Sequence, residues 1–280
     1  MSRAQPLDAK LSLVPLSRPL MTGEVLDAGF RLFRAGLLRT LPYSGLAVLV
    51  FELPAVLSIF SLTSFTRGSG GSFLVSHEKA TAWVVASLLG AALLGVITLR
   101  LQAVSKGVRP RFRAEIVTVL RRWPAALIAS LGAFGLPFLL FSLGKVLNSL
   151  LPGVALIFIG ALLLWPMSLF VVALPAFWCD RLGPFAAIAQ ALRVSRRRSW
   201  RMFGAMLATA GMVAVFYAVS TILIAMLSQM IGRADLFLIA TVSSMLSLVV
   251  GAFGVPFVLA VLIVAYEDLK LRRDLQGWRA

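Results

Sequence analysis

Six stretches of mostly apolar residues limit the fold of this chain more than any other feature. They occupy residues 42–62, 82–101, 124–143, 154–178, 204–226 and 236–265. A helix needs about 20 such residues to cross the hydrocarbon core of a bilayer, and water-soluble domains rarely contain runs of this length. We therefore expect an all-α, polytopic membrane protein with six transmembrane helices.

The composition excludes an ordinary soluble domain. The chain is 60% hydrophobic and 14% charged, with a mean hydropathy of +0.94, whereas soluble domains carry about 45–50% apolar and about 25% charged residues. The formal net charge of +16 would otherwise favour a nucleic-acid partner. Instead, 23 of the 27 Lys and Arg residues lie on one side of the predicted membrane. This asymmetry explains the basicity without nucleic acid.

The same asymmetry predicts the orientation, because short loops rich in Lys and Arg stay in the cytoplasm. Residues 1–40, 102–123, 179–203 and 267–280 are then cytoplasmic, and so are both termini. We expect a mobile tail over residues 1–20, one membrane domain over 21–273 and a second tail over 274–280. Arg100 lies at a cytoplasmic edge, where its side chain is expected to extend towards the headgroups. Aromatic residues that bound the spans are expected at the interfaces, namely Tyr43, Trp83, Trp123, Trp178, Trp200 and Tyr266.

Three cytoplasmic segments have a helical period but are too polar to span a membrane: residues 24–39, 111–122 and 184–198. Their apolar stripes are Leu26, Phe30, Phe33 and Leu37; Phe112, Ile116, Val119 and Trp123; and Phe185, Ile188 and Leu192. Basic amphipathic helices of this kind lie in the headgroup plane and favour anionic lipid. The candidate lipid contacts are Arg31, Arg34, Arg111, Arg122, Arg193, Arg196, Arg197 and Arg198. Alternatively, these helices are linkers packed beneath the bundle.

A seven-residue motif occurs twice inside predicted spans. The segments 132–138 and 251–257 share six of seven residues. Paired helices interrupted by Gly and Pro point to a transporter-like binding site, although chance in a composition rich in Gly, Ala and Phe is the alternative. The candidate substrate-binding residues are Gly132, Gly135, Pro137, Gly251, Gly254, Pro256 and Glu52.

Glu52 is included because it falls near the middle of the first span, where a carboxyl group is costly. Each proline frees a backbone carbonyl one turn upstream. We expect the two motifs to meet, with a protonated Glu52 donating to these carbonyls. The alternative is a neutral carboxyl that is hydrogen-bonded within the bundle.

The chain offers little for catalysis. It has one cysteine, Cys179, and one histidine, His77, so a site that needs paired imidazoles or several thiolates is excluded. No phosphate-binding loop with strand–loop–helix context is present. We expect no metal, no cofactor and no enzymatic activity.

Three cytoplasmic motifs carry a family resemblance over about residues 18–273. They are Arg18-Pro19-Leu20-x-x-Gly23-Glu24-Val25-Leu26-Asp27 with Phe30-Arg31-Leu32-Phe33-Arg34; Asp180-Arg181-Leu182-Gly183-Pro184 with Ala191-Leu192-Arg193-x-Ser195 and Trp200-Arg201; and Ala265-Tyr266-Glu267-Asp268-Leu269-Lys270-x-Arg272-Arg273. The chain resembles the bacterial six-helix membrane family related to the membrane domain of glycerophosphodiester phosphodiesterases. The resemblance implies a six-helix bundle in the bacterial inner membrane. It does not carry over diesterase activity, because that activity belongs to a separate catalytic barrel with histidines and metal-binding acids.

Two functional hypotheses remain. The first is a non-enzymatic, lipid-handling or transporter-like role in the cell envelope. The second is a membrane scaffold that organises anionic lipid or a partner at the cytoplasmic face.

Overall fold

The computed structural model describes residue 16 and residues 18–62, 77–108, 111–130, 172–195, 199–231 and 236–277. Over this part of the chain the regular elements are helices, and no strand is present. The elements are α1 (Thr22–Leu62), α2 (His77–Ser105), α3 (Phe112–Ser130), a short helix over 172–179, α6 (Pro184–Ser195), α7 (Ser199–Ile231) and α8 (Leu236–Gly277). The all-α prediction is confirmed to this extent.

Three of these helices are long and apolar enough to cross a membrane. The candidate spans are Val85–Ser105, Trp200–Met226 and Met245–Leu275, and they coincide with the predicted second, fifth and sixth spans. The predicted first span lies within α1, and most of the third and fourth lies outside the described residues. The chain is therefore a membrane protein by the length and composition of its helices, and three of the six predicted spans are accounted for.

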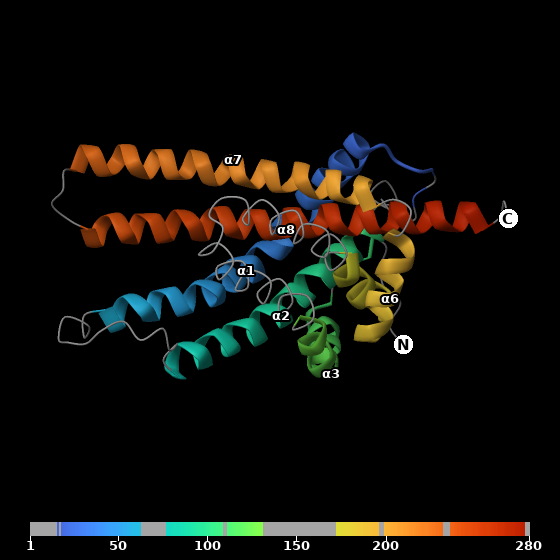
Figure 1. Ribbon diagram of the computed structural model, residues 1–280, viewed down its shortest axis with the longest axis horizontal. Coiled ribbons are helices and arrows are strands. Elements are labelled where there is room, and N and C mark those ends of the chain that lie inside the picture. The colour runs from blue at the N-terminus through green and yellow to red at the C-terminus, as the bar shows by residue number, and fades with distance from the viewer. Residues whose placement is uncertain are drawn as a thin grey trace, which may run out of the picture.

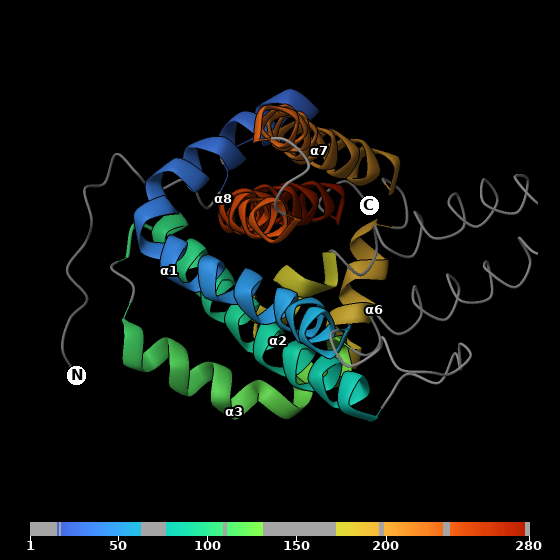
Figure 2. The same cartoon turned by 90° about the vertical axis from the view of Figure 1, so that its left-hand side faces the viewer.

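Helix α8 is the centre of the assembly. It runs beside α7 over most of its length, and α1 curves around it while α2 packs against α1 (Figures 1 and 2). Helices α3 and α6 lie across the long axis of α7 and α8, near the end that carries the C-terminus (Figures 1 and 2). The first part of α1 also crosses over α8 at this end (Figure 2). We call the first part of α1 together with α3 and α6 the crosswise helices.

Two predicted boundaries were wrong, because helices continue where separate elements were expected. The surface segment 24–39 and the first span are one helix of 41 residues, α1. Pro42 lies between them, and a proline inside a helix bends it without ending it when other groups meet the freed carbonyls. Helix α3 likewise continues through Pro124 to Ser130, so residues 124–130 belong to the crosswise helix and do not begin a new element.

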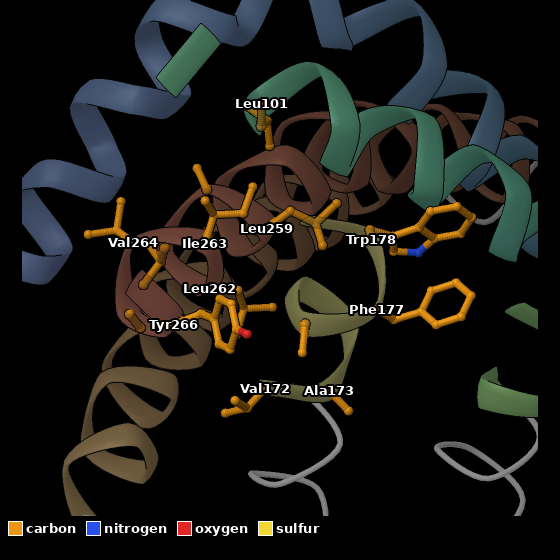
Figure 3. Close-up of a cluster of buried hydrophobic side chains, with 14 of the residues drawn as sticks. Leu101, Val172, Ala173, Phe177, Trp178, Leu259, Leu262, Ile263, Val264 and Tyr266 are labelled. Carbon is orange, nitrogen blue, oxygen red and sulfur yellow. The ribbon is translucent and has the colours of Figure 1, made fainter. Parts of the chain in front are cut away.

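A segment of α8, residues 259–266, is buried on every side. A helix that is apolar all round must be enclosed by protein or lipid, and here protein encloses it (Figure 3). The core around it includes side chains of the six other described helices: Leu32 of α1, Leu101 of α2, Val119 of α3, Val172, Phe177 and Trp178 of the short helix, Ala191 of α6 and Met202 of α7. Trp178 and Tyr266, which were expected at the membrane interfaces, are 2% and 0% exposed, so their rings pack against protein in this core.

Glycines set how closely α1 and α2 approach this core. A Cβ atom on Gly29 of α1 would lie 2.6 Å from Val261 Cγ2 and 2.9 Å from Val261 Cα of α8. A Cβ atom on Gly36 would lie 2.8 Å from Leu101 Cδ2 of α2. Because the obstacle at Gly29 includes backbone, α1 can cross α8 at this distance only without a side chain.

We predict that Gly29→Ala separates α1 from α8 and lowers the free energy of unfolding by about 1–3 kcal/mol, the usual cost of overpacking. Gly45→Ala is the control, since no atom lies within 4 Å of its Cβ position in the same helix. Alanine there should be neutral or stabilising by about 0.5–1 kcal/mol. Thermal unfolding in detergent measures both, and equal stabilities for the two variants would contradict the close crossing.

Candidate membrane-interface site

The crosswise part of α1 packs through a different face from the one expected. Its buried residues are Val25, Gly29, Leu32, Gly36 and Thr40. At about 100° per residue, this face lies about a quarter turn from the stripe of Leu26, Phe30, Phe33 and Leu37. Phe30 is 53% exposed although its ring touches Phe257 of α8 at a centroid distance of 6.4 Å. The face that packs combines Leu32 and Val25 with the small residues Gly29, Gly36 and Thr40, and the predicted stripe lies at the edge of the contact.

Helix α6 also packs through a face other than its predicted stripe, whereas α3 does so only in part, because Val119 of its stripe is buried. Helix α6 buries Ala187, Ala191 and Val194, while Phe185 is 75% exposed and Leu192 is also exposed. Helix α3 buries Glu115, Val119 and Ala126, and it leaves Phe112 and Trp123 exposed. The buried face of α3 thus includes a carboxyl group, Glu115.

Large apolar side chains therefore gather on the outer faces of this end of the molecule. Trp200, at the start of α7, is 81% exposed. We define the interface rim as Phe30, Phe112, Trp123, Phe185, Leu192 and Trp200. These residues belong to the first part of α1, to α3 and α6, and to the start of α7, and these parts lie towards the end of α8 that carries the C-terminus (Figure 1).

Beneath the rim, a buried ion pair joins α2 to α3. Arg100 Nε donates to Glu115 Oε2 at 2.8 Å, and Arg100 Nη1 donates to the carbonyl of Arg39 in α1 at 2.7 Å. The guanidinium also lies 4.2 Å from the ring centroid of Tyr43. Arg100 is thus enclosed by three helices, and the expectation that it extends towards the headgroups was wrong. The physical reason is Glu115, which supplies a carboxylate inside the bundle.

A second polar cluster ties the short helix to α8. Asp180, which follows that helix, accepts a hydrogen bond from the Tyr266 hydroxyl at 2.6 Å. Both of its carboxylate oxygens also accept from Lys270 Nζ at 3.0 Å. Because a charged carboxylate makes stronger hydrogen bonds than a neutral acceptor, Asp180 fixes this helix end against α8.

A third cluster holds residues 18–21, the segment before α1, which we call the strap. The backbone N–H of Leu20 donates to Asp268 Oδ1 at 2.7 Å, and Asp268 also pairs with Arg272 Nε at 2.8 Å. The carbonyl of Leu20 accepts from Arg272 and from Arg201 Nη2, the latter at 2.9 Å. One residue of the strap is thereby bound to both α7 and α8.

The start of α1 is then capped by its own first turn. Glu24 accepts from the backbone N–H of Met21 at 2.7 Å and from Arg18 at 2.6 Å. This is half of a capping box. The Met21 N–H bond and then Arg18 lower the pKa of the Glu24 carboxyl.

The candidate lipid-contacting arginines fall into three groups. Arg34 and Arg193 are exposed, and Arg31 is exposed while forming an ion pair with Asp27 at 2.5 Å. Arg111 is exposed at the start of α3. Arg122 donates to the carbonyls of Phe177 and Arg181, so it links α3 to the short helix. Arg196, Arg197 and Arg198 lie outside the described residues.

The second copy of the duplicated motif packs between α1 and α7. A Cβ atom on Gly251 would lie 2.8 Å from Val48 Cγ2, and one on Gly254 would lie 3.6 Å from Val213 of α7. Glu52 is in α1, one turn beyond Val48, and its side chain is outside the described part. The first copy, with Gly132, Gly135 and Pro137, lies outside it as well, so the meeting of the two motifs stays a prediction.

Pro256 frees a backbone carbonyl one turn upstream, as expected, but the donor to that carbonyl is not Glu52. Its missing N–H frees the carbonyl of Ala252, and Ser44 Oγ of α1 donates to that oxygen at 2.6 Å. Both groups are buried. This acceptor is therefore met by Ser44 and not by Glu52. The signal for this donor in the sequence is Ser44, a small hydroxyl residue about two turns before Glu52.

The described residues offer little further chemistry. They contain no group of three or more His, Cys, Asp and Glu side chains that could hold a metal. A cavity of about 20 Å³ beside Thr22, Arg201 and Asp268 has room for about one water molecule. Desolvation raises the pKa of the Cys179 thiol to about 12, and the carboxylates of Glu267 and Asp180 act in the same direction. Cys179 is therefore protonated at neutral pH and a poor nucleophile.

Comparisons with known proteins add no relative: no family model, no curated protein and no solved structure matches this chain.

We predict that Ser44→Ala lowers the free energy of unfolding by about 1–3 kcal/mol, because the buried Ala252 carbonyl loses its donor. In a Pro256→Ala background, residue 256 regains an N–H that can bond to Ala252. The same serine substitution should then cost less than about 1 kcal/mol. Denaturation of the four proteins of this double-mutant cycle in detergent gives the coupling, and strict additivity would refute the assignment of Ser44.

We also predict that Asp268→Ala lowers the free energy of unfolding by about 3 kcal/mol, because Arg272 is left without its partner in a largely buried site. The side chains of this pair are 7% and 14% exposed. Asp27→Ala is the control, since the Asp27–Arg31 pair has the same spacing and is exposed, so it should cost at most about 0.5 kcal/mol. Similar losses for both variants, measured by thermal unfolding, would show that the strap contact is not stabilising.

Proposed function

We propose that this chain is a non-enzymatic, six-span protein of the bacterial inner membrane that handles anionic lipid, with both termini in the cytoplasm. The three apolar helices and the distribution of Lys and Arg support the membrane topology. The resemblance to the family related to the membrane domain of glycerophosphodiester phosphodiesterases supports the bacterial location. On this proposal the chain shares the membrane domain of that family without its catalytic barrel.

One electrostatic observation carries the lipid role. Five carboxylates among the described residues are paired with cations of the protein itself: Glu24, Asp27, Glu115, Asp180 and Asp268. Arginines nevertheless remain exposed around the same end of the molecule, namely Arg34, Arg113, Arg121 and Arg193. This surplus positive charge suits phosphate headgroups, and each Lys or Arg near an anionic leaflet contributes about 1 kcal/mol.

Transport is the second candidate. It is favoured by the Gly251–Pro256 segment of α8, which lies between α7 and α1. Helix α1 also carries Glu52. Against it, Ser44 and Val48 already occupy the α1 side of this segment. The scaffold hypothesis uses the same exposed arginines to recruit an acidic partner protein in place of lipid.

The lipid role predicts selectivity for anionic lipid in a reconstituted bilayer. In proteoliposomes, spin-labelled phosphatidylglycerol should associate with the protein more strongly than spin-labelled phosphatidylcholine. Replacing Arg34, Arg113, Arg121 and Arg193 together by Gln should lower this preference at least about two-fold, and raised salt should act in the same direction.

The matched control replaces the same four residues by Lys, which retains the charge and should retain most of the preference. Equal association of the two lipids with the unmodified protein would contradict lipid handling and favour the scaffold. A preference that is lost with Lys as well as with Gln would point to specific guanidinium contacts.

A further inference from the structure

The interface rim suggests where this end of the protein lies in the membrane. We infer that the crosswise helices form a collar embedded in the cytoplasmic leaflet, with the rim side chains among the upper acyl chains. The inference deepens the lipid role proposed above and rests on the same membrane orientation.

The direction of the crosswise helices differs from that of the spanning helices (Figures 1 and 2). Helices α7 and α8 are membrane-spanning by length and composition, so their long axis approximates the membrane normal. Helices α3 and α6 cross this axis (Figures 1 and 2). A helix perpendicular to the normal, near the end of the spanning helices, lies in or just beneath the headgroup layer.

Helix α6 is divided into three faces. At about 100° per residue, the buried Ala191, the exposed Phe185 and the exposed Arg193 point in separate directions. In α1, Phe30 and Arg34 are one turn apart, and both point away from the buried Leu32. An ordinary two-faced surface helix would pack all of its large apolar residues inward, whereas each of these helices also leaves large apolar residues exposed.

The residues in and around the rim favour anionic lipid as the material that covers it. Two of its members are tryptophans, Trp123 and Trp200, and tryptophan favours the level of the headgroups. Exposed arginines from α1, α3 and α6 border it, which complements an anionic leaflet. A protein partner would need an acidic, apolar surface that follows four separate elements. Anionic lipid offers acidic headgroups and apolar chains without a fixed shape, so lipid is the occupant of the rim in this inference.

Spin labels on adjacent residues of α6 test the depth directly. Phe185 and Ala186 are both exposed, but they face about 100° apart, and Ala186 shares its side of the helix with Arg193. Single Cys variants Phe185→Cys and Ala186→Cys are made in a Cys179→Ala background, labelled with a nitroxide and reconstituted in phosphatidylglycerol-containing nanodiscs. The label at 185 should collide with oxygen at least about two-fold more than with a water-soluble nickel chelate, and the label at 186 should show the reverse.

Tryptophan quenching gives a second measurement that leaves α6 unchanged. Lipids brominated in the upper acyl chain should quench a protein that retains Trp200 more than the Trp200→Phe variant. They should leave the emission of the enclosed Trp178 nearly unaffected, as a Trp178→Phe comparison shows.

The inference is overturned if labels at 185 and 186 are equally accessible to the nickel chelate, since the rim then faces water. It is also overturned if both labels are shielded from oxygen and chelate alike, because protein then covers the rim. Either result can occur while phosphatidylglycerol selectivity persists, so failure of the collar is distinct from failure of the lipid role.

Discussion

Residues 259–266 of α8 are apolar on every side and buried on every side, and the rest of the structure follows from that enclosure. A helix segment this apolar must be covered by protein or surrounded by lipid. The six other described helices contribute to the core around it, and α1 reaches it only because Gly29 has no side chain. The bend of α1 around α8 is therefore a packing requirement.

Polar groups then fix the elements that cover this core. Glu115 and Asp180 each bind a cation from another helix, and Asp268, which pairs with Arg272 in its own helix, also accepts from the backbone N–H of Leu20. In Asp268 and Glu115 the pairs are largely buried, so loss of one partner is costly even where the net gain from the pair is small. The consequence for function is that five carboxylates are used internally while arginines stay at the surface. The proposed preference for anionic lipid rests on these exposed arginines.

Much of the architecture could be predicted from periodicity and charge. Hydropathy located the helices, and the 3.6-residue period located the crosswise segments. The face of each crosswise helix could not be predicted, because a hydrophobic pattern identifies large apolar residues and not the partner that they meet. The packing faces contain small residues, namely Gly29, Gly36, Ala187 and Ala191. Small residues contribute little to a hydrophobic pattern, so a single sequence does not show that they pack. For the same reason Ser44 was overlooked as the donor to Ala252.

By itself the sequence determined that the chain is helical, that it is too apolar for water and that its cations gather in a few segments. These properties depend on local composition and spacing. Only the tertiary structure decided that Trp178 and Tyr266 lie in a core, that Arg100 pairs with Glu115 and that Leu20 is bound to α8. Each of these facts depends on a contact between residues distant in the chain, and the geometry of such contacts exists only once the helices have packed.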